Sequence, residues 1–126
     1  MTNLETAIRA ELKRDHVSFA ELSRIEGFRG SCEIGFLDRN ILIWQSISRE
    51  AIDIIRRIQV AHEVYLIPAS SALIYIIDGV TLNLPIAKRW QHYKTLHWLP
   101  TVFTLEWWPD RGTALPALAL PTTAAA

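Results

Sequence analysis

The stretch "AIDIIRRIQVAHEVYLIPASSALIYIIDG", residues 51–79, decides what kind of fold this chain forms. In its first half, at about 100° per residue, the apolar side chains fall on one arc of a helix and the charged ones on the opposite arc. Ser48 is a good N-cap for that helix, and Glu50 lies where the helix dipole favours an acid. Two apolar runs follow, and Asp78-Gly79 is typical of a tight hairpin turn. We therefore predict a helix starting near Ser48 and a three-stranded antiparallel meander over residues 64–84.

The chain before this stretch predicts two more helices and a hairpin. "TNLE" at 2–5 and "SFAE" at 18–21 each have the form of a capping box, in which a hydroxyl caps the helix and a glutamate returns to the cap. We expect one helix to about Arg14 and a shorter one ending near Gly27. Between residues 31 and 46, two apolar runs flank turn-forming residues, which predicts a hairpin. Both faces of its strands are apolar, so we expect a sheet covered on both sides.

The end of the chain predicts one more strand and a tail. "TVFTLEW" at 101–107 alternates as a strand does, whereas residues 113–126 are rich in Ala, Pro and Thr without a periodic pattern. We expect residues 1–112 to form a single globular domain and residues 113–126 a flexible tail. The predicted fold class is α+β, with three helices and an antiparallel sheet built from hairpins.

Composition and charge limit the partners that are expected. The chain has 126 residues, of which 50% are hydrophobic and 21% charged, as in one folded domain. Thirteen basic residues balance thirteen acidic ones, so a nucleic-acid contact requires a local patch. The lone Cys32 and an amino terminus unlike a secretory signal predict a cytoplasmic protein. No membrane partner is expected, because the longest apolar run, residues 72–77, is far shorter than the roughly 20 residues that span a bilayer.

The order of elements in residues 4–84 resembles a winged-helix (winged helix-turn-helix) DNA-binding domain: a capped helix, a short strand at "HV", a second capped helix, a helix ending in "IIRRIQ" and a hairpin. The hairpin of residues 31–46 is inserted between the second and third helices. In that family the last helix enters the major groove and the hairpin wing contacts the flanking backbone or the minor groove. The resemblance implies that the wing tip is the loop 68–71 and that three arginines face the DNA, namely Arg49, Arg56 and Arg57.

A second interpretation of the third helix is open. Asp53 lies one helical turn from each of its arginines and can pair with any of them. A helix packed on a sheet, with a salt-bridged outer face, explains these residues without DNA.

The segment "KRWQHYKTLHWLP", residues 88–100, interleaves cations with aromatic rings, and no acidic residue lies between Asp78 and Glu106. Cations neutralise phosphates and rings stack on bases, so this pattern suits single-stranded nucleic acid. The predicted contact residues are Lys88, Arg89, Trp90, Tyr93, Lys94 and Trp98. The same composition suits a protein interface on a Trp-rich surface of residues 90–108, for another protein or a second copy. A third interpretation is that the tryptophans fill the core and the lysines solvate a loop.

Enzymatic chemistry has little support in the sequence. The histidines and Cys32 lack the paired short spacings of a zinc site, and neither a phosphate-binding loop nor a nucleophile elbow occurs. We expect no catalytic residues, no metal and no cofactor. The predicted function is therefore a small non-enzymatic binding or regulatory protein, with DNA or single-stranded nucleic acid as the first candidate partner and a protein as the alternative.

Overall fold

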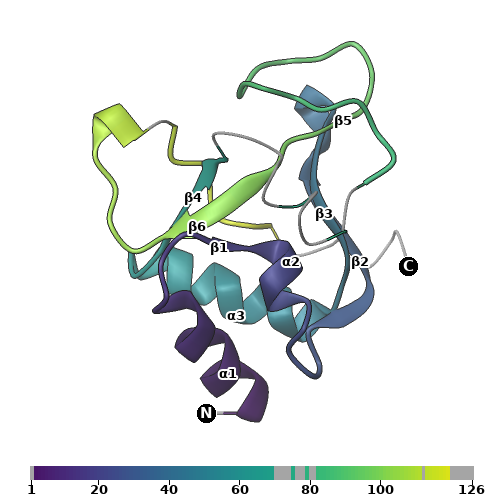
Figure 1. Cartoon of the computed structure of the whole chain (residues 1–126). Helices are drawn as coiled ribbons and strands as arrows, with labels where there is room; N and C mark the ends of the chain where they lie inside the picture. The colour runs from purple at the N-terminus through teal and green to yellow at the C-terminus, as the bar shows by residue number, and fades with distance from the viewer. Residues whose placement is uncertain (1, 70–74, 76–78, 80–81, 112, 120–126) are drawn as a thin grey trace.

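The computed structural model of the chain describes residues 2–69, 75, 79, 82–111 and 113–119. Within these residues the fold is α+β, with three α-helices and two three-stranded sheets (Figure 1). The helices are α1 (Asn3–Leu12), α2 (Phe19–Leu22) and α3 (Arg49–Val60). Figure 1 shows the helices grouped at one end of the molecule, while the green segment that leads into β5 lies at the opposite end. No helix among the described residues is long and apolar enough to cross a membrane.

The predicted helix starts are confirmed by their caps. The Thr2 hydroxyl accepts a hydrogen bond from the Glu5 backbone at the start of α1, and the Ser48 hydroxyl accepts one from Ala51 at the start of α3. Ser18 and Glu21 form both halves of the capping box before α2. In α1 the second half of the predicted box is replaced, because the Glu5 carboxylate binds two arginines.

The first sheet has the order β1-β6-β4, all antiparallel, from β1 (Val17–Ser18), β6 (Thr101–Thr104) and β4 (Tyr65–Pro68). The second has the order β2-β3-β5, from β2 (Arg29–Phe36), β3 (Ile41–Ile47) and β5 (His97–Trp98), and β5 runs parallel to β3. The predicted hairpin and late strand are thus confirmed, and they lie in different sheets.

The β2–β3 hairpin is closed by the short 3₁₀ helix η1 (Leu37–Arg39) and by Asn40, whose φ is 56°. The two strands approach closely at Gly35, where a Cβ atom would lie 2.5 Å from the Ile41 carbonyl oxygen. Most of β3 is buried, but the first half of β2 is exposed, so the expectation that both faces are covered is wrong for β2. Exposed polar residues such as Ser31 and Glu33 occupy that half of the strand.

The predicted meander over residues 64–84 is corrected by the pairing of β4. Tyr65 and Leu66 in β4 pair with Thr104 and Phe103 in β6, which follows more than thirty residues later in the chain. Residues 82–84 do not form a strand. The other predicted strand lies largely outside the described residues, as does most of the Asp78-Gly79 turn. An apolar run indicates that a strand will be buried, but it does not indicate which other strand will pair with it.

The core lies between α3 and the two sheets, as the helical arc predicted. Ile52 and Ile55 on the apolar face of α3 are fully buried. The Tyr75 hydroxyl donates to the Thr101 carbonyl oxygen at 2.7 Å and accepts from the Phe19 backbone N–H at 3.1 Å, so it joins β6 to α2. Burial raises the pKa of this phenol above its ordinary value. The two hydrogen bonds of the Tyr75 hydroxyl satisfy this buried polar atom inside the fold.

Residues 113–119, predicted to begin a flexible tail, are packed against the domain. Leu115 and Leu118 are buried in the core. The Leu115 backbone N–H donates to the Leu66 carbonyl of β4 at 2.8 Å, and the Leu118 N–H donates to Gln59 Oε1 of α3 at 2.8 Å. These contacts hold residues 113–119 against β4 and α3, and the flexibility predicted for residues 113–126 stays a prediction. Residues 120–126 of the predicted tail lie outside the described residues.

The order α1, β1, α2, α3 agrees with the order on which the winged-helix resemblance was based, and the β2–β3 hairpin does separate α2 from α3. The strand β4 of the predicted wing is paired with β6, and residues 70 and 71 of the predicted wing tip lie outside the described residues. The resemblance to a winged-helix domain stays a prediction.

Candidate nucleic-acid interface

The arginines of α3 differ in the number of ion pairs that they form. Arg57 donates to Glu5 Oε1 of α1 at 3.1 Å and to Asp53 Oδ2 of its own helix at 3.2 Å. Arg9 in turn contacts Glu5 at 3.0 Å and Glu63 at 2.7 Å. These five side chains form an ion-pair network that joins α1 to α3. The salt-bridged interpretation of the helix thus holds for Arg57.

The network also changes the ionisation of its members. The hydrogen bond from Arg9, followed by that from Arg57, holds the pKa of Glu5 below its ordinary value. The hydrogen bond that Arg57 donates to Glu5, followed by the one that it donates to Asp53, raises the pKa of Arg57. Both charged forms are therefore stabilised by the contact between the two helices.

Arg49 and Arg56 are exposed on the outer face of α3, where they form no ion pair with another described residue. Glu50 is exposed on the same helix. Of the three arginines predicted to face DNA, these two keep their guanidinium groups accessible. Asp53 was considered as a partner from the sequence, but Glu5 was missed, because it lies 52 residues from Arg57 along the chain.

Trp98, predicted as a stacking ring, belongs to the core. Its side chain is only 1% exposed, and its indole packs 5.1 Å from the Tyr75 ring and 6.3 Å from the Trp44 ring, centroid to centroid. The interpretation of the tryptophans as core residues is correct for Trp98. It offers no face to a ligand and is removed from the proposed contact residues.

The segment before β5 is fastened onto the turn of the β2–β3 hairpin. The Tyr93 backbone N–H donates to the Arg39 carbonyl oxygen at 3.0 Å, and the Asn40 side-chain amide donates to the Tyr93 carbonyl oxygen at 2.8 Å. The His97 N–H donates to the Asn40 carbonyl oxygen at 2.8 Å. Two regions more than fifty residues apart in the chain therefore form one surface.

Aromatic rings and a guanidinium group are stacked on this surface. The Arg39 guanidinium carbon lies 4.4 Å from the centroid of the Trp90 ring, and the Phe36 ring meets Trp90 edge to face at 4.8 Å. Tyr93 and His97 are stacked at 4.2 Å with 24° between their planes. Arg39 is one of the turn-forming residues of the hairpin predicted between residues 31 and 46, and nothing in its neighbourhood along the chain indicates that it will lie over Trp90.

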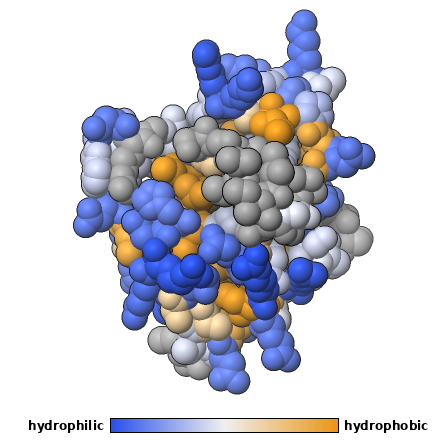
Figure 2. Space-filling view, viewed as in Figure 1, coloured by the Kyte–Doolittle hydropathy of each residue, from blue (hydrophilic) through white to orange (hydrophobic). Residues whose placement is uncertain are grey.

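Around these rings lie three exposed cations, Lys88, Arg89 and Lys94. The Tyr93 hydroxyl donates to the Arg89 carbonyl oxygen at 3.0 Å and accepts from the Arg89 N–H at 3.3 Å, which fixes the backbone between them. In Figure 2 hydrophilic side chains project from this end of the molecule beside an exposed apolar patch. We name the surface the basic end, and its members are Arg39, Lys88, Arg89, Trp90, Tyr93 and Lys94.

A second surface carries the remaining tryptophans. Leu105, Trp107 and Trp108, which follow β6, are 38%, 37% and 42% exposed. The Trp107 ring lies 6.4 Å from the ring of Tyr65 in β4. This surface matches part of the Trp-rich region predicted as a protein interface.

Neither a metal-binding group nor similarity to a known protein assigns a function to these surfaces. Among the residues that the structure describes, no group of three His, Cys, Asp or Glu side chains is placed to hold a metal ion. Comparison of the chain with protein-family models, with curated proteins and with solved structures gives no match.

Proposed function

We propose that this protein is a non-enzymatic binding protein that holds single-stranded nucleic acid on its basic end. The observation that carries the proposal is the Arg39 guanidinium carbon 4.4 Å from the centroid of the Trp90 ring, beside the cations of the chain segment 79–105, which contains no acidic residue. Phosphates are neutralised by such cations, and planar groups between them accept bases.

Charge supports this location over the outer face of α3. The basic end brings together Arg39, Lys88, Arg89 and Lys94, with Asp38 as the acid that accompanies them in η1. On α3, Arg57 is already paired with two carboxylates. A polyanion therefore gains more favourable contacts at the basic end, where fewer cations must first leave an internal partner.

Stacking geometry supports a single strand over a duplex. Trp90 has Phe36 and Arg39 as neighbours, and both Arg39 and Trp90 are partly exposed. Arginine planes accept unstacked bases, which a single strand exposes and a duplex does not. Tyr93 adds a second ring, with His97 stacked against it.

The experiment is a salt titration of binding to a fluorescent oligothymidylate, measured by anisotropy between roughly 50 and 200 mM salt. The triple variant Lys88→Gln, Arg89→Gln, Lys94→Gln should bind more weakly, with a salt slope lower by about 2 units, because three phosphate contacts are lost. The double variant Arg49→Gln, Arg56→Gln is the matched control and should bind as the wild type does. The reverse pattern would assign binding to α3 instead, as the winged-helix resemblance implies.

The role of Arg39 is tested by two variants that separate charge from shape. Arg39→Lys keeps the positive charge but removes the planar group, whereas Arg39→Gln removes both. If a base stacks on this residue, Arg39→Lys should lose at least about fivefold in affinity at low salt. An Arg39→Lys protein with wild-type affinity would show that Arg39 acts only through its charge. Absence of binding to both single strands and duplexes at low salt would refute nucleic-acid binding altogether.

The alternative function is self-association through the surface of Leu105, Trp107 and Trp108, which is favoured by the exposure of these three large apolar side chains. Exposed aromatic residues are frequent anchors of protein interfaces. Sedimentation velocity over a concentration series should then show a dimer that is lost in Trp108→Ser. A monomer at all concentrations would exclude this alternative.

A further inference from the structure

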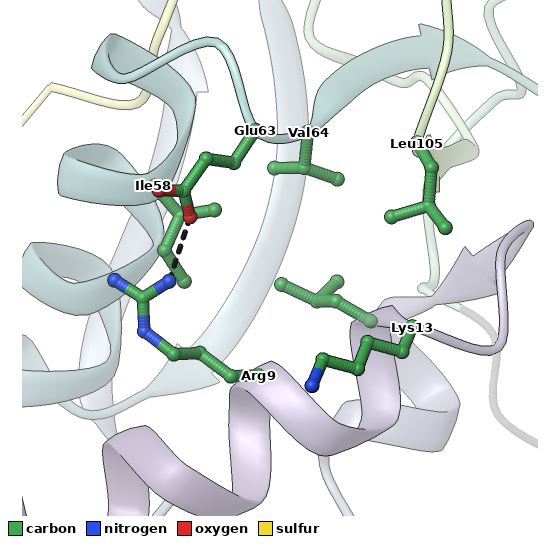
Figure 3. Close-up of a pocket in the computed structure, with 7 residues that line it drawn as sticks. Arg9, Lys13, Ile58, Glu63, Val64 and Leu105 are labelled. Carbon is green, nitrogen blue, oxygen red and sulfur yellow. Dashed lines mark hydrogen bonds and ion pairs between the residues drawn. The ribbon is translucent and has the colours of Figure 1, made fainter.

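A pocket of about 310 Å³ lies between α1, the end of α3 and the residue that follows β6 (Figure 3). Figure 3 shows Val64 and Leu105 on one side of the opening, with Arg9 and Lys13 on the other. This pocket is lined by residues that take no part in the basic end, and its volume is at the lower end of the range for small-molecule sites. A ligand in this pocket would therefore occupy a different place from nucleic acid on the basic end.

The inner surface of the pocket is apolar. Leu12, Ile58 and Val64 are buried in the core and turn part of their surface toward the cavity, while Leu105 forms a partly exposed wall. The Leu105 backbone N–H donates to Asp15 Oδ1 at 2.9 Å, which ties this wall to the chain just after α1. A hydrocarbon group that entered here would be removed from water on several sides.

Three charged side chains line the opening, namely Arg9, Lys13 and Glu63. Arg9 is neutralised within the ion-pair network, at 2.7 Å from Glu63 and 3.0 Å from Glu5. Lys13 is exposed, lies along the edge of the pocket beside α1 in Figure 3, and forms no ion pair with an acid among the described residues. The pocket thus combines an apolar interior with one ammonium group at its edge that forms no ion pair with a described residue.

We propose that this pocket binds a small apolar monocarboxylate, such as a medium-chain fatty acid. The carboxylate would pair with the Lys13 ammonium group, and the hydrocarbon chain would lie on Leu12, Ile58 and Val64. The chemistry follows from the pocket itself, because a second negative charge would have to lie on the apolar interior, where it is costly. A neutral hydrocarbon would leave the ammonium group unused.

The probe is octanoate, titrated into ¹⁵N-labelled protein and followed by NMR, with octanol as the uncharged probe of equal chain length. Octanoate should shift the amide signals of Lys13, Val64 and Leu105, and it should bind roughly two- to fivefold more tightly than octanol, as one exposed ion pair allows. Lys13→Met should reduce the affinity for octanoate to that for octanol and leave octanol binding unchanged.

Two more variants make the result specific to this pocket. Lys88→Met removes the same group from the basic end and should leave octanoate binding as in the wild type. Leu105→Asp changes a partly exposed wall residue, so the fold is retained, and its carboxylate should weaken octanoate more than octanol. The proposal is overturned if octanoate and octanol bind equally to the wild type, if the shifts map away from the pocket, or if no shift occurs at millimolar octanoate.

Discussion

Leu118 provides the sharpest test of how this domain ends. Its side chain is 2% exposed, and its backbone N–H donates to Gln59 Oε1 of α3 at 2.8 Å. The substitution Leu118→Ala removes three buried carbon atoms and leaves a cavity against the core, while the backbone hydrogen bond can persist. Replacements of this kind cost about 2–5 kcal/mol, and the lower half of the range applies where a peripheral segment can relax into the space.

We therefore expect Leu118→Ala to lower the free energy of unfolding by about 2–3 kcal/mol. With a urea m-value of about 1.5 kcal/mol/M, the unfolding midpoint should fall by roughly 1.5 M. Tryptophan fluorescence is a suitable signal, because Trp44 and Trp98 are buried in the same core. The matched control is Leu37→Ala, in which the same atoms are removed from a side chain that is 72% exposed. Equal midpoints for the two variants would refute the packing of residues 113–119 on the domain.

Three further predictions concern the core and the helix contacts. The hydrogen bond from Arg9 holds the pKa of Glu5 below its ordinary value of 4.5, so the stability that Glu5 contributes is present above that pH and is lost as the pH falls through its folded-state pKa. Wild type and Glu5→Gln should therefore differ in urea midpoint at about pH 7, and this difference should shrink as the pH falls below 4.5. Ile55→Ala should cost about 2–5 kcal/mol by urea unfolding, whereas Arg56→Ala should cost almost nothing; equal losses would mean that the faces of α3 are misassigned. Gly35→Ala should lower the melting temperature through about 1–3 kcal/mol of steric conflict with the neighbouring strand, and an unchanged value would disprove that close approach.

Much of the candidate site was visible in the sequence as composition, but its geometry was not. The exposed cations Lys88, Arg89 and Lys94 were predicted from a segment without acids, and they do lie on the surface. The sequence did not separate Trp90, which is half-buried there, from Trp98, which is in the core. Both are tryptophans in the same short segment, and only the packing of β5 against β3 distinguishes them.

The sequence by itself determined the local elements of this protein. Thr2, Ser18 and Ser48 cap the helices because each hydroxyl accepts a hydrogen bond from the backbone N–H three residues further along the chain. Turn-forming residues likewise close the β2–β3 hairpin. These interactions need only a few neighbouring residues, so their pattern can be recognised in a short window.

The tertiary structure decided which distant elements meet. It paired β4 with β6, placed Glu5 on Arg57, and laid Arg39 over Trp90. Apolar burial has no direction, so a hydrophobic run does not specify its partner, and a charged residue does not indicate which distant opposite charge it will meet. These choices depend on how all the elements pack together at once, and for that reason the geometry of both proposed sites follows only from the folded chain.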